Sequence, residues 1–231
     1  MGHTVRVDGD AGALDRIRDA RRRLAASGSP RVREDGDFER VSLPAEDGDV
    51  LRDLLMEEDA ATVVEIGLAY GASALAISEA LIARHEPACR HLIVDAFQEQ
   101  FHDAGWTALI DAGLGGCCEL VRDRSQFALP QMVRDGVVVD AAFVDGSHIF
   151  HHVFVDLFFL RWLVRPGGLV VLDDCEWPSV AAAARYFELN AGWTCIPIAR
   201  PTRLRAYRLP PTLEEPDFRE FVPFIQESKS K

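Results

Sequence analysis

The stretch from Val138 to Asp174 constrains the fold of this chain more than any other part. Two apolar runs of strand length, VVDAAFV and GLVVL, end in Asp145 and in the pair Asp173-Asp174 respectively. Between them, Ile149 to Val164 has the length and apolar character of one helix, closed by Pro166-Gly167-Gly168. A strand–helix–strand unit makes its two strands parallel. Both acidic ends are therefore expected at the same edge of the sheet.

Three carboxylates at the carboxyl edge of a parallel sheet are typical of a site for a hard cation such as Mg²⁺. This edge is also where α/β proteins bind their ligands. An aspartate after a strand can instead cap the next helix or turn, which would explain one acid. Because three acids follow two adjacent strands, we predict that Asp145, Asp173 and Asp174 bind a divalent cation.

Strand and helix patterns alternate from Ala61 onward. The apolar runs ATVVEIG, RHLIVDAF and CCELVRD predict three buried strands ahead of the two described above. Helical patterns separate them, including one over 97–114 and a short one after Ser125 that we expect to break near Pro130. The runs WTCIPIA and RLRAYRL predict a C-terminal antiparallel strand pair. The alternation indicates a doubly wound, mostly parallel α/β sheet, with residues 45–231 forming a single domain.

Residues 1–44 are predicted to form an N-terminal helical extension. Leu14, Ile17 and Leu24 follow helical spacing, and arginines occupy the other faces. One interpretation is a peripheral helix that packs through a thin apolar stripe. The other is a lid over the site or a contact within a homo-oligomer, and the sequence leaves both open.

Composition narrows the class of protein. A net charge of -12 argues against a nucleic-acid-binding protein, because such binding depends on neutralising phosphates. The five cysteines are odd in number and lack a CxxC pair, which favours reduced thiols. The polar start MGHTVRVDGD predicts no signal peptide, and no apolar run has the length of a membrane span. We therefore expect a cytoplasmic protein with a small-molecule ligand, binding neither membrane nor nucleic acid.

The turn after the first predicted strand suits a nucleotide. Gly67 allows a sharp turn and Gly71 a close approach of backbone to ligand, but Ala69 replaces the middle glycine of a dinucleotide fingerprint. This departure lowers the odds of NAD or FAD. Asp95, at the end of the second strand, follows at the interval of an acid that accepts hydrogen bonds from ribose hydroxyls.

Together these residues resemble the class I S-adenosylmethionine-dependent methyltransferases, which have a Rossmann-like fold, and more narrowly the metal-dependent O-methyltransferases of the catechol type. EIGLAYGAS, residues 65–73, is similar to the cofactor motif of that family. The resemblance implies that the following residues bind the cofactor: Glu65, Gly67, Tyr70, Gly71, Ser73, Asp95, Ser125, Gln126 and Asp145. Within this set, Ser125-Gln126 is similar to the pair that contacts adenine. The resemblance also implies that Asp145, Asp173 and Asp174 are magnesium ligands.

One residue departs from the catechol enzymes. His148 stands three residues after the first metal ligand, where those enzymes have a lysine base. The run DGSH, an apolar helix and PGGLVVLDD is more similar to the branch that methylates sugar hydroxyls of macrolide-type natural products. The resemblance then implies Mg²⁺-assisted methylation of a hydroxyl on a small polyhydroxylated molecule, with His148 as general base.

Other interpretations stay open. The same fold could serve an NAD-dependent oxidoreductase or a non-catalytic scaffold. His148 and His152 have the spacing of a zinc pair, with Cys175 as the one candidate for a third ligand. Trp106 and Trp177 are either core residues or walls of a substrate pocket.

Overall fold

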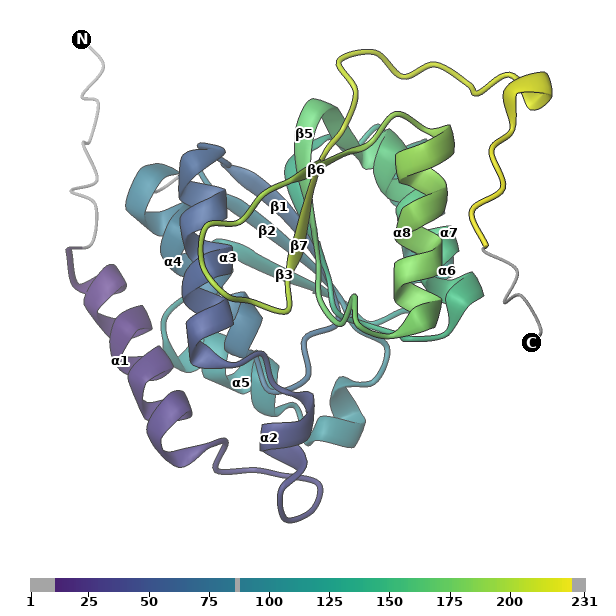
Figure 1. The fold of residues 1–231 in the computed structure, drawn as a ribbon. Helices are drawn as coiled ribbons and strands as arrows, with labels where there is room; N and C mark the ends of the chain where they lie inside the picture. Colours follow the sequence, from purple (N-terminus) through teal and green to yellow (C-terminus); the bar gives the residue numbers. More distant parts are fainter. Residues whose placement is uncertain (1–10, 86–87, 226–231) are drawn as a thin grey trace, which may run out of the picture.

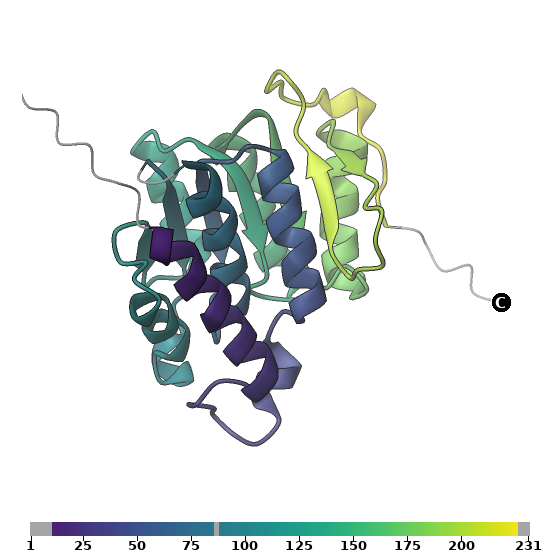
Figure 2. The same ribbon diagram turned by 90° about the vertical axis from the view of Figure 1, so that its left-hand side faces the viewer.

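A computed structural model describes residues 11–85 and 88–225. Its centre is a single twisted sheet with helices on both faces (Figure 1). The helices α1, α3, α4 and α5 pack together on one face, and α6, α7 and α8 on the other. Figure 2 views the first face and shows α1 and α3 in front of the sheet, where both contact α4.

The sheet has seven strands in the order β3-β2-β1-β4-β5-β7-β6. The first five in chain order are parallel, whereas β7 is antiparallel to both β5 and β6. Their bounds are β1 Thr62–Ile66, β2 Arg90–Val94, β3 Cys118–Val121, β4 Val139–Val144, β5 Val164–Leu172, β6 Thr194–Ile196 and β7 Arg205–Arg208. The prediction of a doubly wound sheet with a C-terminal antiparallel pair is confirmed.

The α-helices are α1 Ala11–Ser27, α2 Asp37–Val41, α3 Ala45–Glu57, α4 Ala72–His85, α5 Ala104–Asp111, α6 Ser125–Arg134, α7 Phe150–Leu163 and α8 Pro178–Asn190. Two short 3₁₀ helices, η1 Gln98–Phe101 and η2 Phe218–Glu220, complete the described part. No helix within residues 11–85 and 88–225 is long and apolar enough to cross a membrane.

Strand residues alternate between two hydrophobic clusters because successive side chains point to opposite faces. Val64 and Ala142 pack under α6, α7 and α8, whereas Val63 and Phe143 pack under α3 and α4. All four side chains are fully buried, as expected of parallel strands covered on both faces. This continuous burial holds the strand ends, and hence the residues that follow them, in fixed positions.

The crossover from β4 through α7 to β5 forms as predicted, with Val144 paired in parallel with Leu172. The boundary before β5 was predicted wrongly. Pro166-Gly167-Gly168 does not separate helix from strand but lies inside β5, which starts at Val164 directly after α7. The pairing shifts there from Val139 opposite Val164 to Ala141 opposite Leu169. A bulge absorbs the extra residues, since proline is tolerated at such a position.

Two helix predictions need correction. The stretch 97–114 is not one helix: His102 and Asp103 adopt positive φ and separate η1 from α5. Pro130 does not break α6, which is continuous around it. Leu129 and Met132 remain buried against the core, and this packing outweighs the one lost backbone hydrogen bond.

The part of the N-terminal extension from residue 11 onward forms α1 and α2, as a helical extension predicts. Ile17 and Leu24, two of the three residues of the predicted stripe, are buried in a cluster with residues of α4 and α5, whereas Leu14 is only partly buried. Residues 1–10 lie outside the described part.

Candidate active site

The carboxyl ends of β1, β2, β4 and β5 open into one cavity of about 510 Å³. Each strand end contributes at least one lining residue: Gly67 after β1, Asp95 after β2, Asp145 after β4 and Asp174 after β5. The predicted meeting of these strand ends is therefore observed. Ser125 and Gln126, at the start of α6, line the same cavity.

Gly67 is required by its surroundings. Its φ is +94°, and a Cβ atom built on it would lie 2.2 Å from the backbone oxygen of Asp145. No side chain fits there, so the backbone of the β1 turn lies directly against the β4 turn. Gly71 has a φ of +85°, and a Cβ atom built on it would lie 3.1 Å from the backbone of Gly105, so its small size allows α5 to approach the start of α4. Of the two motif glycines, only Gly67 lines the cavity.

Asp95 holds the turn after β1 in shape. Its Oδ2 atom accepts hydrogen bonds from the backbone amides of Leu68 and Ala69 at 3.0 and 3.2 Å, and from Gln98 Nε2 at 2.9 Å. Its Oδ1 atom accepts from the Phe97 amide at 2.7 Å. A carboxylate oxygen can accept more than one hydrogen bond, so Oδ1 keeps capacity for a ligand hydroxyl.

Besides Gly71, three predicted cofactor residues do not line the cavity. The buried Ser73 hydroxyl donates to Glu65, and Glu65 Oε2 lies 2.9 Å from His91 Nε2 inside the protein. The Tyr70 hydroxyl is also buried and donates to Asp37 of α2. In this structure Glu65, Tyr70 and Ser73 support the turn from within and make no contact with the cavity.

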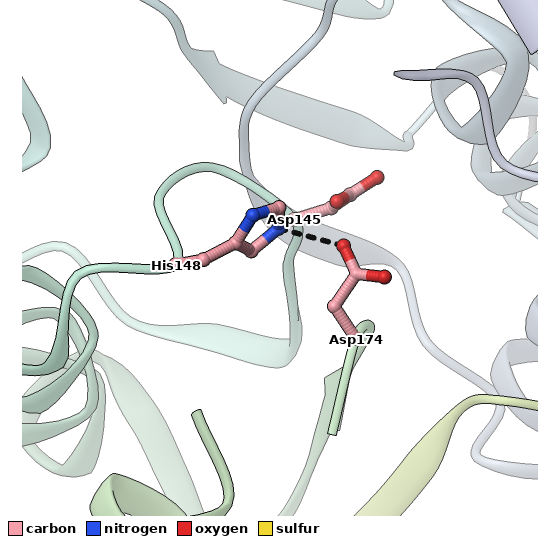
Figure 3. A group of neighbouring side chains, drawn as sticks. All are labelled: Asp145, His148 and Asp174. Atoms are coloured by element: carbon pink, nitrogen blue, oxygen red, sulfur yellow. Dashed lines mark ion pairs between the residues drawn. The ribbon is translucent and has the colours of Figure 1, made fainter. Parts of the chain in front are cut away.

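An acidic cluster with one histidine lies at the ends of β4 and β5 (Figure 3). Asp145, His148 and Asp174 each bring one ligand atom within 4.8 Å of the others. His148 Nε2 lies 2.6 Å from Asp174 Oδ2, and its ring stacks on exposed Trp177 at 6.1 Å between centroids. Trp177 is thus exposed beside the cluster without lining the cavity, while Trp106 packs partly buried against the core.

Asp173 lies outside this group. Its Oδ2 atom accepts a hydrogen bond from Arg203 Nη2 at 2.5 Å, and its Oδ1 atom accepts one from the Asp174 amide. Arg203 Nη1 also lies 3.8 Å from Asp174 Oδ1. An arginine therefore balances part of the negative charge where a cation was predicted.

Arg203 was not among the residues predicted for the site, although the pairing of β5 with β7 places it there. β7 pairs antiparallel with β5, and Leu172 lies opposite Arg205. Continuing that register by two residues sets position 203 opposite position 174. The strand prediction for RLRAYRL, combined with its pairing to β5, would have placed Arg203 at the acidic edge.

Two of the three predicted metal ligands, Asp145 and Asp174, are placed so that they could bind one divalent cation. Asp145 and Asp174 offer the carboxylate oxygens that Mg²⁺ prefers, whereas the His148 nitrogen beside them suits a transition metal better. Removal from water, together with repulsion by Asp173 and Asp174, raises the pKa of Asp145 well above its ordinary value. A bound cation would relieve that repulsion. Asp173 could join only after leaving Arg203.

The His148–Asp174 pair has opposite effects on its two members. The hydrogen bond to Asp174 raises the pKa of His148, and the same contact lowers the pKa of Asp174. The pair therefore favours the charged form of both side chains.

The N-terminal extension reaches the cavity. Arg40 and Val41 line it, and buried Asp37 joins their helix to Tyr70. Arg33 donates two hydrogen bonds to Asp37, at 2.8 and 2.9 Å, and holds the pKa of that carboxyl well below its usual range. Asp37 was not among the predicted site residues, because nothing in its neighbourhood indicates that Tyr70 is its partner.

Residues 64–175 match the model of a family described as a methyltransferase domain. This segment is a methyltransferase domain. The prediction of an enzyme of the methyltransferase class is thereby confirmed, and the matched segment runs from β1 to the end of the β5 turn. No protein with curated annotation matches the sequence.

Solved structures agree with this fold. The methyltransferase is similar to cofactor-bound Rv0187 from MTB, with a TM-score of 0.64 and 20% identity over 89% of this chain and 93% of that one. It is similar to the O-methyltransferase TomG of Streptomyces achromogenes, which is involved in tomaymycin synthesis and was solved with SAM (TM-score 0.57, 23% identity, 85% and 88% covered). It is also similar to a Bacillus cereus O-methyltransferase in complex with SAH, with a TM-score of 0.59 and 17% identity over 88% of this chain and 92% of that one. These likenesses confirm the Rossmann-like fold.

Proposed function

We propose that this methyltransferase transfers the methyl group of S-adenosylmethionine to a hydroxyl of a small polyhydroxylated molecule, with help from a divalent cation. One observation carries the proposal. The Gly67 turn and Asp95, which suit a nucleoside, open into the same cavity as the Asp145, His148 and Asp174 cluster. The turn that suits a nucleoside and the acidic cluster thus share one cavity. TomG and the Bacillus cereus protein, O-methyltransferases of similar fold, support the reaction class.

Each part of the cavity has a role in this proposal. The tight backbone turn at Gly67 admits the cofactor, and Asp95 accepts hydrogen bonds from its ribose. Asp145 and Asp174 would hold the cation, which when bound orients vicinal hydroxyls and lowers the pKa of the attacking one. Trp177 and Ile149, both exposed beside the cluster, offer apolar contact to the acceptor.

His148 is the proposed general base. Its Nε2 atom contacts Asp174, and this contact favours the protonated ring, which cannot accept a proton. Asp174 must therefore leave His148, as binding of a cation by Asp174 would require, before the neutral ring can accept the proton of the acceptor hydroxyl. The side chain is 48% exposed, which leaves the ring free to turn toward an acceptor. A positioned base of this kind contributes about 10²- to 10⁴-fold in rate.

Two measurements test the proposal. Calorimetry should show binding of S-adenosylhomocysteine and none of NAD; the reverse result would favour an oxidoreductase. Methyl transfer from labelled S-adenosylmethionine to a panel of vicinal diols and sugars should stop in EDTA and return with Mg²⁺. Activity that persists in EDTA would remove the cation from the mechanism while leaving methyl transfer intact.

A further inference from the structure

A guanidinium group lies at the end of β5, where two of the three predicted metal ligands stand. Arg203 Nη2 donates a hydrogen bond to Asp173 Oδ2 at 2.5 Å, and Arg203 Nη1 lies 3.8 Å from Asp174 Oδ1. Asp173 is 2% exposed, and Arg203 is one of the residues that line the cavity. One positively charged side chain therefore bridges both acids of the β5 end.

The main chain around Arg203 is anchored, whereas its side chain is not. Thr202 Oγ1 donates a hydrogen bond to Asp47 of α3 and accepts one from the Leu204 amide. Leu204 itself is buried in the cluster under α3 and α4. The Arg203 side chain is 30% exposed, and its Nε atom has no hydrogen-bond partner within the described residues. Arg203 is thus a cation tethered beside the acids, and tethering gives it a high effective concentration there.

Asp173 is already satisfied by contacts within the protein. Its Oδ1 atom accepts a hydrogen bond from the Asp174 amide at 2.8 Å, and its Oδ2 atom accepts the one from Arg203. Asp173 is also absent from the group in which Asp145, His148 and Asp174 bring their ligand atoms together (Figure 3). A guanidinium and a divalent cation repel each other and cannot share one carboxylate oxygen.

We propose that Arg203 competes with the divalent cation for Asp173, limits the cation to the carboxylates of Asp145 and Asp174, and so keeps its binding weak. This inference rests on the cation of the proposed function. The affinity of a protein site for a hard cation depends on how many charged oxygen ligands it supplies. A cation held by two carboxylates instead of three binds less tightly and keeps more positions for hydroxyls of the acceptor.

The test measures binding of Mn²⁺ alone, by the loss of its free electron paramagnetic resonance signal and by calorimetry. Arg203→Gln removes the charge and should bind Mn²⁺ at least about tenfold more tightly than wild type, since a hydrogen bond to a charged group is worth about that factor. The gain should depend on Asp173. In the Asp173→Asn background, Arg203→Gln should change the affinity by less than about threefold, because the third carboxylate is absent.

A matched control separates competition from a general effect of charge. Arg205→Gln removes an exposed arginine from the same strand segment without touching the cavity lining, and it should change Mn²⁺ affinity by less than about threefold. Urea unfolding checks that each variant folds. If Arg203→Gln does not unfold cooperatively, Arg203→Met takes its place.

The possible outcomes distinguish this inference from the proposed function. Wild-type binding of Mn²⁺ that Arg203→Gln leaves unchanged would overturn the competition and uphold the cation. An equal gain in Arg205→Gln, or in the Asp173→Asn background, would also overturn it. Absence of Mn²⁺ binding in the wild type and in every variant would remove both the competition and the cation, while binding of S-adenosylhomocysteine would still support methyl transfer.

Discussion

The Nε2 atom of His148 lies 2.6 Å from the Oδ2 atom of Asp174, which joins the loop after β4 to the turn after β5. The two residues are 26 positions apart, with all of α7 and β5 between them. Their contact requires the parallel crossover, because only that connection sets both strand ends at one edge. The position of the proposed base therefore depends on the acid that we predict to hold the cation.

Replacement of His148 tests the base. His148→Ala should lower kcat by about 10²- to 10⁴-fold and change the affinity for S-adenosylhomocysteine by less than about threefold, since His148 sits at the acceptor end. His151→Ala removes an exposed imidazole from the start of α7 and serves as the matched control. Unchanged turnover in His148→Ala would exclude this side chain as the base.

Replacing Gly67 by alanine should destabilise the protein more than the strain of a positive φ alone would, because the added methyl group has no space. Gly136 also has a positive φ, +71°, but a Cβ atom there meets nothing within 4 Å. Gly136→Ala should therefore show only the conformational cost, about 1–2 kcal/mol. Gly67→Ala adds a clash with the Asp145 backbone and should lower the free energy of unfolding further and abolish S-adenosylhomocysteine binding. Urea unfolding and calorimetry measure both effects; equal destabilisation of the two variants would contradict the clash.

The contact between Tyr70 and Asp37 should hold the extension against the domain. Tyr70→Phe removes a buried hydrogen bond and should cost about 1–2 kcal/mol of unfolding free energy. It should also speed trypsin cleavage after Arg31 and Arg33, which precede α2. Asp217→Asn, in an exposed ion pair of the C-terminal region, is the control.

Proteolysis also tests whether the extension is a lid. S-adenosylhomocysteine should slow trypsin cleavage after Arg31 and Arg33, because Arg40 and Val41 line the cavity it would fill. Cleavage at the same rate with and without the ligand would leave the extension as a peripheral helical segment.

Burial of Asp156 on α7 raises its pKa, which predicts a pH-dependent stability difference in ligand-free protein. The unfolded carboxyl ionises near ~3.9, whereas the folded one ionises at about 7, so the folded chain retains a proton in that window. Wild type should therefore lose stability relative to Asp156→Asn as the pH rises from 4 to 7, by up to about 4 kcal/mol, and then level off. Urea unfolding at several pH values gives the difference; a constant difference would mean an ordinary folded pKa.

Several features could be predicted from local patterns. The runs before Asp145 and Asp173 are apolar and β-branched, and the segment between them is helix-length, so strand type, parallel pairing and the edge for the acids all follow. Gly67 could be identified because a sharp turn after a buried strand demands its conformation. The ends of helices and strands were harder to predict. Pro130 and Pro166 suggested a break in a helix and the start of a strand, but Pro130 lies inside the continuous helix α6 and Pro166 at a bulge inside β5.

The site was less predictable from the sequence than the fold was. The motif resemblance assigned Glu65, Tyr70 and Ser73 to the cofactor, yet all three are buried in the interior. Glu65 and Tyr70 contact His91 and Asp37, which are far away in sequence, and Ser73 bonds to Glu65 within the motif.

The sequence by itself determined the order of strands and helices and the edge at which the acids gather, because periodicity and chain connectivity are local properties. Only the tertiary structure decided that Asp173 pairs with Arg203, that Asp174 contacts His148 and that Asp156 is left with an unpaired oxygen. Charge pairing depends on distances between segments that pack against one another. Those distances arise from register and burial, which no single stretch of sequence contains.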